Sequence, residues 1–236
     1  MTVLPTNLSP CPTPQPACRG FSLVELAVVL VIVGLLASGL MLSLGTQRES
    51  ATSQEAQRQL ENIREALIGF ALANGRLPCP AAANLANTDA NAGRENCALQ
   101  HGVTPWVTLG LPESDPWGNR FTYYAHPLFT APVPAGALAA FTLDTVGNAA
   151  IKDAVGAGYD IASALPAVIV CHGARPSGAW LPSGTQIAGA AGDEAENANA
   201  NTTFVAHTPT PAFDDQLSWI VPAILKSRMV AAGKLP

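Results

Sequence analysis

Acidic side chains gather near the C-terminal end of this 236-residue sequence, where they could bind a metal ion. One acidic cluster lies within a segment rich in Gly, Ala, Asn and Pro, residues 173–211, and a pair of aspartates follows it. Hard oxygen ligands presented by a loop are the ligands that calcium prefers. The candidate calcium ligands are Asp214, Asp215, Glu194, Glu196 and Asn197. A solvated acidic loop without a metal is the alternative interpretation.

Another unusual carboxylate belongs to Glu25, the single charged residue of an apolar run from Phe21 to Leu44. As a helix this run would be roughly 36 Å long, enough to cross a hydrocarbon core of about 30 Å. An unpaired carboxylate inside a membrane helix is costly, so such a residue is a candidate for a function. The alternative is that Glu25, near the start of the helix, lies at the interface and is solvated by lipid headgroups.

The cysteines suggest a disulfide rather than a zinc site. None of the five cysteines forms a CxxC pair, and no paired histidine spacing accompanies them. Cys79 and Cys97 would close a short loop beyond the membrane helix, and in an oxidising compartment a disulfide there would contribute roughly 3 kcal/mol. Cys171 lies in the apolar run 167–171, so the simple interpretation is a small buried hydrophobic residue.

A catalytic dyad is the chemistry that Cys171 and the adjacent His172 would suggest. Neighbouring residues on a strand point to opposite faces, so these two side chains cannot readily act together. The sequence has no GxSxG, HExxH or phosphate-binding glycine loop, and we therefore predict that the protein is not an enzyme. The formal net charge of −5 and the absence of a basic run give no support to a nucleic-acid partner.

The elements that would position these residues begin with one long helix. Residues 1–20 hold five prolines, one basic residue and no acidic residue, which is typical of a leader peptide. The apolar run 21–44 predicts a transmembrane helix, and residues 45–75 predict its amphipathic continuation, which Asn74-Gly75 ends. The residues expected to face the core are Leu60, Ile63, Leu67 and Phe70, with Ala56 and Ala66 beside them.

Residues 76–236 predict a globular α+β head. Short apolar stretches between turns favour an antiparallel sheet. The expected strands are Trp106–Thr108, Arg120–Tyr124, Ala139–Leu143 and Ala167–Cys171. Asp115-Pro116-Trp117-Gly118-Asn119 predicts a turn, and Gly173–Pro211 a long surface loop. Pro222 in a first turn and Gly233 as a stop predict a short C-terminal helix.

The start of the apolar run closely resembles the prepilin processing motif of type IV pilins and of the pseudopilins of type II secretion. The residues that carry the resemblance are Arg19-Gly20-Phe21-Ser22-Leu23-Val24-Glu25 and the apolar residues that follow. The resemblance implies cleavage between Gly20 and Phe21 by an inner-membrane prepilin peptidase, and N-methylation of Phe21. It also implies that Glu25 pairs with the N-terminal amine of a neighbouring subunit during assembly, since that ammonium would neutralise a carboxylate that lipid disfavours.

The turn at 115–119 extends the resemblance into the head, because it looks like the Asp-Pro-Trp-Gly-Asn turn of major pseudopilins. The resemblance implies a pilin-like fold, in which a long N-terminal helix, membrane-spanning in its first half, packs on an antiparallel sheet. It also implies a single-pass protein of the bacterial inner membrane with its head in the periplasm, from which it can enter a periplasmic or surface filament. Major pseudopilins carry a calcium site after a Gly-rich loop, and Asp214 and Asp215 fit that pattern best.

Two functions are compatible with these features. The first is a structural pilin-like subunit, processed by prepilin peptidase and assembled with other subunits into a type II secretion pseudopilus or a type IV pilus. The alternative is a single-pass membrane-anchored binding or adhesion domain that does not polymerise, which would need neither Glu25 nor a Gly20-Phe21 junction. The length of the head favours a minor or specialised subunit, and the sequence leaves the choice of machine open.

Overall fold

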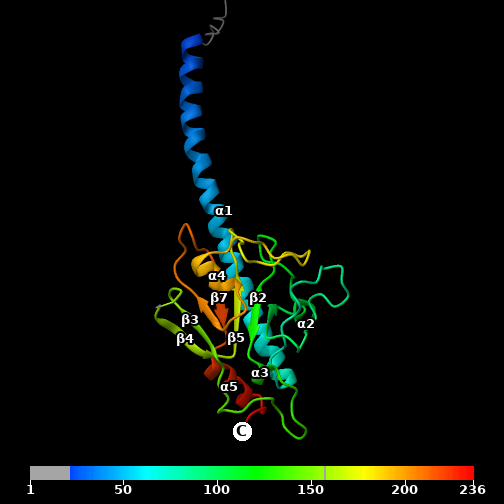
Figure 1. Cartoon of the computed structure of the whole chain (residues 1–236). Coiled ribbons are helices and arrows are strands. Elements are labelled where there is room, and N and C mark those ends of the chain that lie inside the picture. Colours follow the sequence, from blue (N-terminus) through cyan, green and yellow to red (C-terminus); the bar gives the residue numbers. More distant parts are fainter. Residues whose placement is uncertain (1–21, 157) are drawn as a thin grey trace, which may run out of the picture. The chain divides into compact units, whose positions relative to one another are not determined.

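The computed structural model describes residues 22–156 and 158–236, and within these the side chains of all but residues 37–47. The chain divides into two compact units, one up to Arg48 and one from Glu49 to Pro236. Helix α1, Leu23–Asn74, supplies the described part of the first unit and the first element of the second (Figure 1, blue to cyan). Gly20 and Phe21, at the expected cleavage junction, lie outside the described residues.

The first unit is represented by the apolar N-terminal part of α1. The hydroxyl of Ser22 accepts a hydrogen bond from the backbone amide of Glu25 (3.1 Å), which caps the first turn. The side chains of residues 22–36 are exposed on every side of the helix, with Leu23 at 87% and Leu35 at 70% exposure. Within the part of the chain that the structure describes, no helix combines the length and the apolar character needed to cross a membrane.

The C-terminal part of α1 forms one wall of the main core of the head. Its buried side chains are Ala56, Leu60, Ile63, Leu67, Ile68 and Ala71. The predicted apolar stripe is therefore confirmed at three of its four main positions, whereas Phe70 is only half-buried, with the Arg76 guanidinium 5.4 Å from its ring centroid. The helix ends at Asn74 as predicted, and Gly75 takes a φ of +73°. A Cβ at Gly75 would lie 2.3 Å from the carbonyl oxygen of Leu138, so only glycine fits this stop.

A four-stranded antiparallel sheet packs against this part of α1, and both contribute to the same hydrophobic core (Figure 1). In spatial order its strands are β1 (His101–Val103), β2 (Thr122–Ala125), β5 (Ala167–Cys171) and β7 (Gln216–Trp219). β5 matches the predicted strand residue for residue, and β2 overlaps the predicted strand with a start two residues later. The α+β, pilin-like arrangement of a long helix on an antiparallel sheet is confirmed.

A second sheet, which the sequence did not predict, covers the other face of β5. Its strands, in order, are β4 (Asp160–Leu165), β3 (Ala149–Lys152) and β6 (Thr203–Val205), and β3 pairs with β6 in parallel. Ile169 and Cys171 of β5 face the core that includes α1, whereas Val168 and Val170 face the second sheet. Burial on both faces explains why β5 reads as an uninterrupted apolar run rather than an alternating one.

Two expected strands are absent from the head. Trp106–Thr108 lies instead in a short helix, α2 (Trp106–Leu109), which ends at Gly110 with a φ of +69°. The Trp106 indole is buried against Gly93, where any Cβ would lie 2.2 Å from the ring, so contact with a neighbouring loop overrides strand propensity. Ala139–Leu143 has no strand partner, because its Ala139 and Phe141 side chains pack directly into the main core.

The segment Gly173–Pro211 is not the single surface loop that the composition predicts. It contains α4 (Gly192–Ala198) and β6, which is hydrogen-bonded to β3. Asp193 and Glu194 occupy the first turn of α4, where the exposed backbone N–H groups favour negative charge. The acidic cluster therefore belongs to a helix start, which a loop-rich composition hides.

The remaining predicted turn and helix are confirmed. In the 115–119 turn the backbone amides of Trp117 and Asn119 both donate to Oδ1 of Asp115 at 2.9 Å. The short helix α3 (Pro127–Thr130) follows β2. At the C-terminus α5 (Pro222–Ala231) begins with proline in its first turn and is followed by Gly233 at a φ of +67°.

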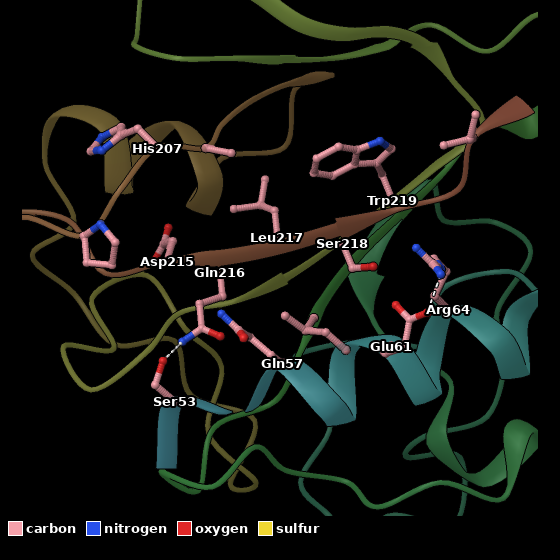
Figure 2. A pocket seen from close by; sticks show the side chains of 14 residues that line it. Ser53, Gln57, Glu61, Arg64, His207, Asp215, Gln216, Leu217, Ser218 and Trp219 are labelled. Atoms are coloured by element: carbon pink, nitrogen blue, oxygen red, sulfur yellow. Dashed lines mark hydrogen bonds and ion pairs between the residues drawn. The ribbon is translucent and has the colours of Figure 1, made fainter. Parts of the chain in front are cut away.

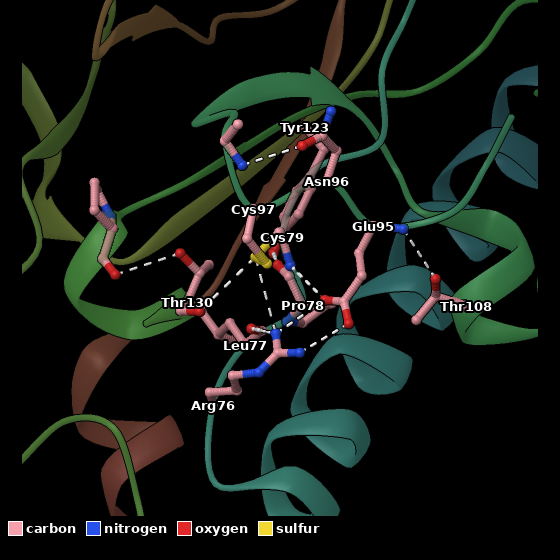
Figure 3. The surroundings of a disulfide bond; sticks show 12 residues. Arg76, Leu77, Pro78, Cys79, Glu95, Asn96, Cys97, Thr108, Tyr123 and Thr130 are labelled. Carbon is pink, nitrogen blue, oxygen red and sulfur yellow. Dashed lines mark hydrogen bonds and ion pairs between the residues drawn. A yellow bond between two sulfur atoms is a disulfide. The ribbon is translucent and has the colours of Figure 1, made fainter. Parts of the chain in front are cut away.

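The predicted disulfide joins Cys79 to Cys97 (Figure 3). Beside it, the guanidinium of Arg76 donates to both carboxylate oxygens of Glu95, at 2.9 and 2.8 Å. Glu95 also accepts a hydrogen bond from the backbone amide of Cys79 at 3.1 Å. We call these four residues, together with Arg120, the disulfide corner.

Arg120 completes the disulfide corner from the sheet side, although its side chain is fully buried. Its Nε and Nη2 donate to Glu113 (2.9 and 2.7 Å), and Nη1 donates to the carbonyl oxygens of Ala83 and Leu85 (2.9 and 2.7 Å) inside the disulfide loop. A further bond runs from Nη2 to the carbonyl oxygen of Pro182 (3.1 Å). All five guanidinium N–H groups can therefore find an acceptor, which makes a buried arginine tolerable.

Candidate functional sites

Three carboxylates from two separate segments of the head meet just before β7. Glu194 comes from α4, and Asp214 and Asp215 precede β7. One oxygen of each lies within 4.8 Å of the others. Glu194 is only 7% exposed and Asp215 only 4%. We call this group the cation site, and it brings together three of the five side chains that the sequence suggests as calcium ligands.

The end of β5 holds Asp214 in this site through backbone donors. The amides of Ala174 and Arg175 both donate to Oδ2 of Asp214 at 3.0 Å. Gly173, at a φ of +69°, directs these amides, and a Cβ on it would lie 2.7 Å from Cγ of Asp214. The absence of a side chain at Gly173 is therefore what allows the carboxylate to approach the backbone.

Asn197 positions Asp215 rather than presenting a ligand oxygen of its own. Its side-chain nitrogen donates to Oδ2 of Asp215 and to the carbonyl oxygen of Val205, both at 2.9 Å. Its side-chain oxygen already accepts from the amide of Val205 at 2.8 Å. Glu196 lies outside the cation site, because its two oxygens accept from the side chains of Asn199 and Asn201 at 3.0 Å each.

Several buried polar atoms of the cation site have no hydrogen-bond partner. They are Oε1 of Glu194, Oδ1 of Asp214, Oδ1 of Asp215, Nδ1 of His172 and Nε of Arg175. Burial, and then repulsion from Asp215 and Asp214, raises the pKa of Glu194 above its ordinary value. Buried carboxylate oxygens without partners are costly, and three of them in one place fit a bound cation. The donor set is all-carboxylate, which suits a hard divalent ion such as calcium.

His172 and Arg175 also belong to this site, although neither was among the ligands predicted from the sequence. Nδ1 of fully buried His172 lies 3.5 Å from Oδ1 of Asp215, and its Nε2 lies 2.9 Å from the hydroxyl of Thr122. Arg175 has its Nε 3.9 Å from Glu194 and Nη2 3.7 Å from Asp214. The sequence signal that could have indicated them is their position: His172 directly follows the apolar strand β5, and Arg175 lies in the segment that leaves it.

Cys171 lies on the opposite face of β5 from His172, as strand geometry predicts. Its thiol is buried and donates to Oδ2 of Asp115 at 3.3 Å. Burial, reinforced by the Asp115 carboxylate, raises the pKa of the Cys171 thiol well above its ordinary value. A thiol held in its neutral form is a weak nucleophile, so these contacts agree with a structural role.

A groove of about 510 Å³ separates α1 from β7 in the head (Figure 2). Gln57, Glu61 and Arg64 line it from α1, and the side chain of Gln216 bridges the two walls by donating to the hydroxyl of Ser53 at 2.8 Å. Asp215 lies at one end of this groove, so the cation site borders it. Leu217 and Trp219 of β7 point away from α1, toward the second sheet, as the figure shows.

Glu25 occupies the first turn of α1 with an exposed side chain. The preceding Leu23 and Val24 and the following Leu26 are also exposed, so the carboxylate is surrounded by apolar surface that nothing in the described first unit covers. A negative charge in a first helical turn is favoured by the helix dipole. Glu25 is also only four residues from Phe21, the expected new N-terminus.

Two family models match consecutive parts of the chain. The prokaryotic N-terminal methylation motif matches residues 16–41, and protein G of the type II secretion system matches residues 43–163, just over half of the chain. The chain belongs to the protein G family of the type II secretion system. The resemblance to prepilin-like proteins is thereby confirmed, and the family match favours the type II secretion side of it.

Relatives of the protein G family agree with this assignment. The type II secretion system core protein G of Aeromonas hydrophila is 30% identical over 139 residues, which cover 58% of this chain and 90% of the relative. The core protein G of Escherichia coli K12 is 32% identical over 110 residues, which cover 44% of this chain and 69% of the relative. No solved structure is a significant match to the chain.

Membership of the protein G family makes this chain a pilin-like structural subunit. The methylation motif match includes Gly20, Phe21 and Glu25, and the protein G match includes the disulfide corner and the 115–119 turn. The match ends at residue 163, so the cation site lies beyond it. The case for a metal in this chain therefore rests on its own carboxylates.

Proposed function

We propose that this chain is a pseudopilin that is cut between Gly20 and Phe21 by prepilin peptidase and methylated on Phe21. It is then anchored in the bacterial inner membrane by the apolar part of α1, with the head in the periplasm. From there it assembles with other pseudopilin subunits into a filament of the type II secretion system. The observation that carries this proposal is the methylation motif followed directly by the protein G match.

The physical chemistry of α1 supports the anchoring and assembly steps. A helix that is apolar on all sides is stable only in lipid or against other helices, and residues 23–36 are exposed and apolar apart from Glu25. A carboxylate in such surroundings requires a partner when it leaves water. The ammonium at Phe21 of a processed neighbouring subunit would supply one.

The test is to produce the full chain with and without prepilin peptidase and to determine the N-terminus of the membrane-bound protein by mass spectrometry. We expect Phe21, N-methylated, with peptidase and the uncut chain without it. Glu25→Ala should be cut normally but should fail to cross-link into filaments with other subunits, whereas Glu55→Ala, on the exposed surface of the head part of α1, should behave as wild type. An E25A chain that assembles normally would favour the anchored, non-polymerising alternative.

We also propose that Glu194, Asp214 and Asp215 bind calcium. The ion would supply positive charge to three buried carboxylates and would thereby link α4 to the segment before β7. The three unpartnered carboxylate oxygens support this. Calcium should raise the melting temperature of the full chain in detergent and a chelator should lower it, and a melting temperature indifferent to both would refute the proposal.

A further inference from the structure

The cation site contains a positive charge that belongs to the protein itself. The guanidinium of Arg175 has its Nε 3.9 Å from Oε1 of Glu194 and its Nη2 3.7 Å from Oδ1 of Asp214. Both distances are too long for hydrogen bonds, and both carboxylate oxygens remain unpartnered. Arg175 thus attracts the two carboxylates by charge but leaves them free to bind something else.

The same guanidinium also donates to two backbone carbonyl oxygens. Its Nη1 donates to the carbonyl oxygen of Pro211, and its Nη2 donates to that of Thr210 at 2.8 Å. Backbone carbonyls and carboxylates are the usual oxygen ligands of calcium. One guanidinium therefore lies against two carboxylates and two carbonyls, and both are oxygen groups of the kinds that calcium accepts as ligands.

Arg175 does not complete the site. Asp215, only 4% exposed, forms no ion pair with Arg175 in the described structure, and fully buried His172 directs an unpartnered Nδ1 to within 3.5 Å of the Asp215 carboxylate. One guanidinium against three carboxylates leaves an excess of negative charge. Because the Arg175 side chain is 42% exposed, it can turn toward water without rearrangement of the backbone amide that holds Asp214.

We propose that Arg175 is an internal competitor of calcium that sets the calcium affinity of this site. Without calcium its guanidinium holds Asp214, Glu194 and the 210–211 carbonyls together, and with calcium it leaves for solvent. This inference rests on the calcium proposal above. Arg175 thereby stabilises the head in the absence of calcium. The gain in melting temperature that calcium brings should therefore be smaller than it would be with the three carboxylates alone.

The experiment compares wild type with Arg175→Gln in the full chain in detergent. Calcium chloride is titrated by isothermal calorimetry, and unfolding is followed by tryptophan fluorescence with chelator or with calcium. R175Q should bind calcium at least about tenfold more tightly, since a positive charge next to the ion is removed. It should also melt at a lower temperature than wild type in chelator, and the gap should close or reverse in calcium. Arg58→Gln, which removes an arginine that is 74% exposed on α1, is the matched control and should change neither quantity.

Each outcome decides between the two proposals. If wild type binds calcium and R175Q binds it no more tightly, the role of Arg175 is wrong and the calcium site stands. If neither protein binds calcium, both proposals are wrong. If R175Q does not fold in chelator, Arg175→Lys serves instead, because its ammonium cannot bridge two carbonyls and two carboxylates at once, and its calcium affinity should lie between wild type and the expected tenfold gain. An R175K affinity equal to or weaker than that of wild type would then overturn the role of Arg175.

Discussion

The disulfide corner and the cation site each join segments of the head that are far apart in the sequence, but their electrostatic arrangements are opposite. In the disulfide corner Arg76 and Glu95 meet at 2.8 and 2.9 Å, beside a covalent bond. In the cation site the nearest guanidinium stays 3.7 Å or more from each carboxylate, and three carboxylate oxygens lack partners.

This difference indicates what each region depends on. A corner whose charges are paired and whose loop is covalently closed needs only an oxidising compartment to be stable. A site that gathers like charges and leaves them unpaired is, on the calcium proposal, further stabilised by an ion that must come from outside. The first should therefore respond to reductant and the second to chelator. Each prediction below tests one side of that contrast.

The largest expected effect is at Arg120 of the disulfide corner. Arg120→Met leaves Glu113 and three buried or partly buried carbonyl oxygens without their donor, and should lower the free energy of unfolding by about 3–5 kcal/mol. Denaturant unfolding of the full chain in detergent measures this. Arg94→Met, which replaces an exposed arginine of the same loop, should change it by less than about 0.5 kcal/mol. Equal losses in the two variants would mean that the hydrogen bonds of Arg120 contribute no more to the free energy of unfolding than those of an exposed arginine.

Removal of the disulfide should come next in size. The double variant Cys79→Ser, Cys97→Ser should lose about 3 kcal/mol of unfolding free energy, because the unfolded chain regains the freedom of an open loop. A reductant should lower the stability of wild type by a similar amount and leave the double variant unaffected. The stabilisation by calcium should persist in both, because within the described residues no hydrogen bond or ion pair joins the disulfide corner to the cation site. A calcium response that disappears with the disulfide would show that the regions are coupled.

At the cation site, calcium at a hundredfold excess over its dissociation constant should stabilise wild type by about 2.7 kcal/mol. Glu194→Gln should lose most of that gain. In chelator, however, E194Q should be as stable as wild type or more stable, because it removes a buried carboxylate whose pKa is raised first by burial and then by repulsion from Asp215 and Asp214. Glu196→Gln, on the same helix but outside the site, is the matched control and should keep the full calcium response. Identical behaviour of the two variants would exclude Glu194 as a ligand.

The smallest effect concerns the pH dependence of the Arg76–Glu95 pair. The hydrogen bond from Arg76 lowers the pKa of Glu95, so the folded protein binds this proton less readily than the unfolded chain. The stabilisation is therefore complete above the ordinary glutamate pKa of about 4.3 and is lost as pH falls through the lower pKa of the folded state. The stability difference between wild type and Glu95→Gln should be at most about 1 kcal/mol at neutral pH, since the pair is partly exposed, and should shrink below about pH 4. A difference that grows on acidification would contradict this sign.

The sequence predicted best those features that short-range chemistry controls. Gly75 and Gly233 end their helices, residues 115–119 form a turn, and Cys79 pairs with Cys97, each as expected. Predictions of strands were less successful, because strand formation needs a partner at long range. Ala139–Leu143 and Ala167–Cys171 are similarly apolar, yet only the second lies between two strands that can pair with it.

The cation site shows the same division. That Asp214, Asp215 and Glu194 carry hard oxygen ligands was readable from the chain, and so was the chance that they share a site. That Asn197 orients Asp215, that Glu196 turns away, and that His172 and Arg175 belong to the site all depend on where α4 and β6 lie, and composition gave no sign of either element.

The sequence by itself therefore determined the family, the apolar helix with its single carboxylate, the helix stops and the disulfide. These depend on residue type and on spacing along one chain segment. The tertiary structure alone decided that three acidic side chains would be buried together without partners and that an arginine would come to lie just out of hydrogen-bonding reach. Burial and unpaired charge are properties of how segments pack in space, and no local pattern encodes them.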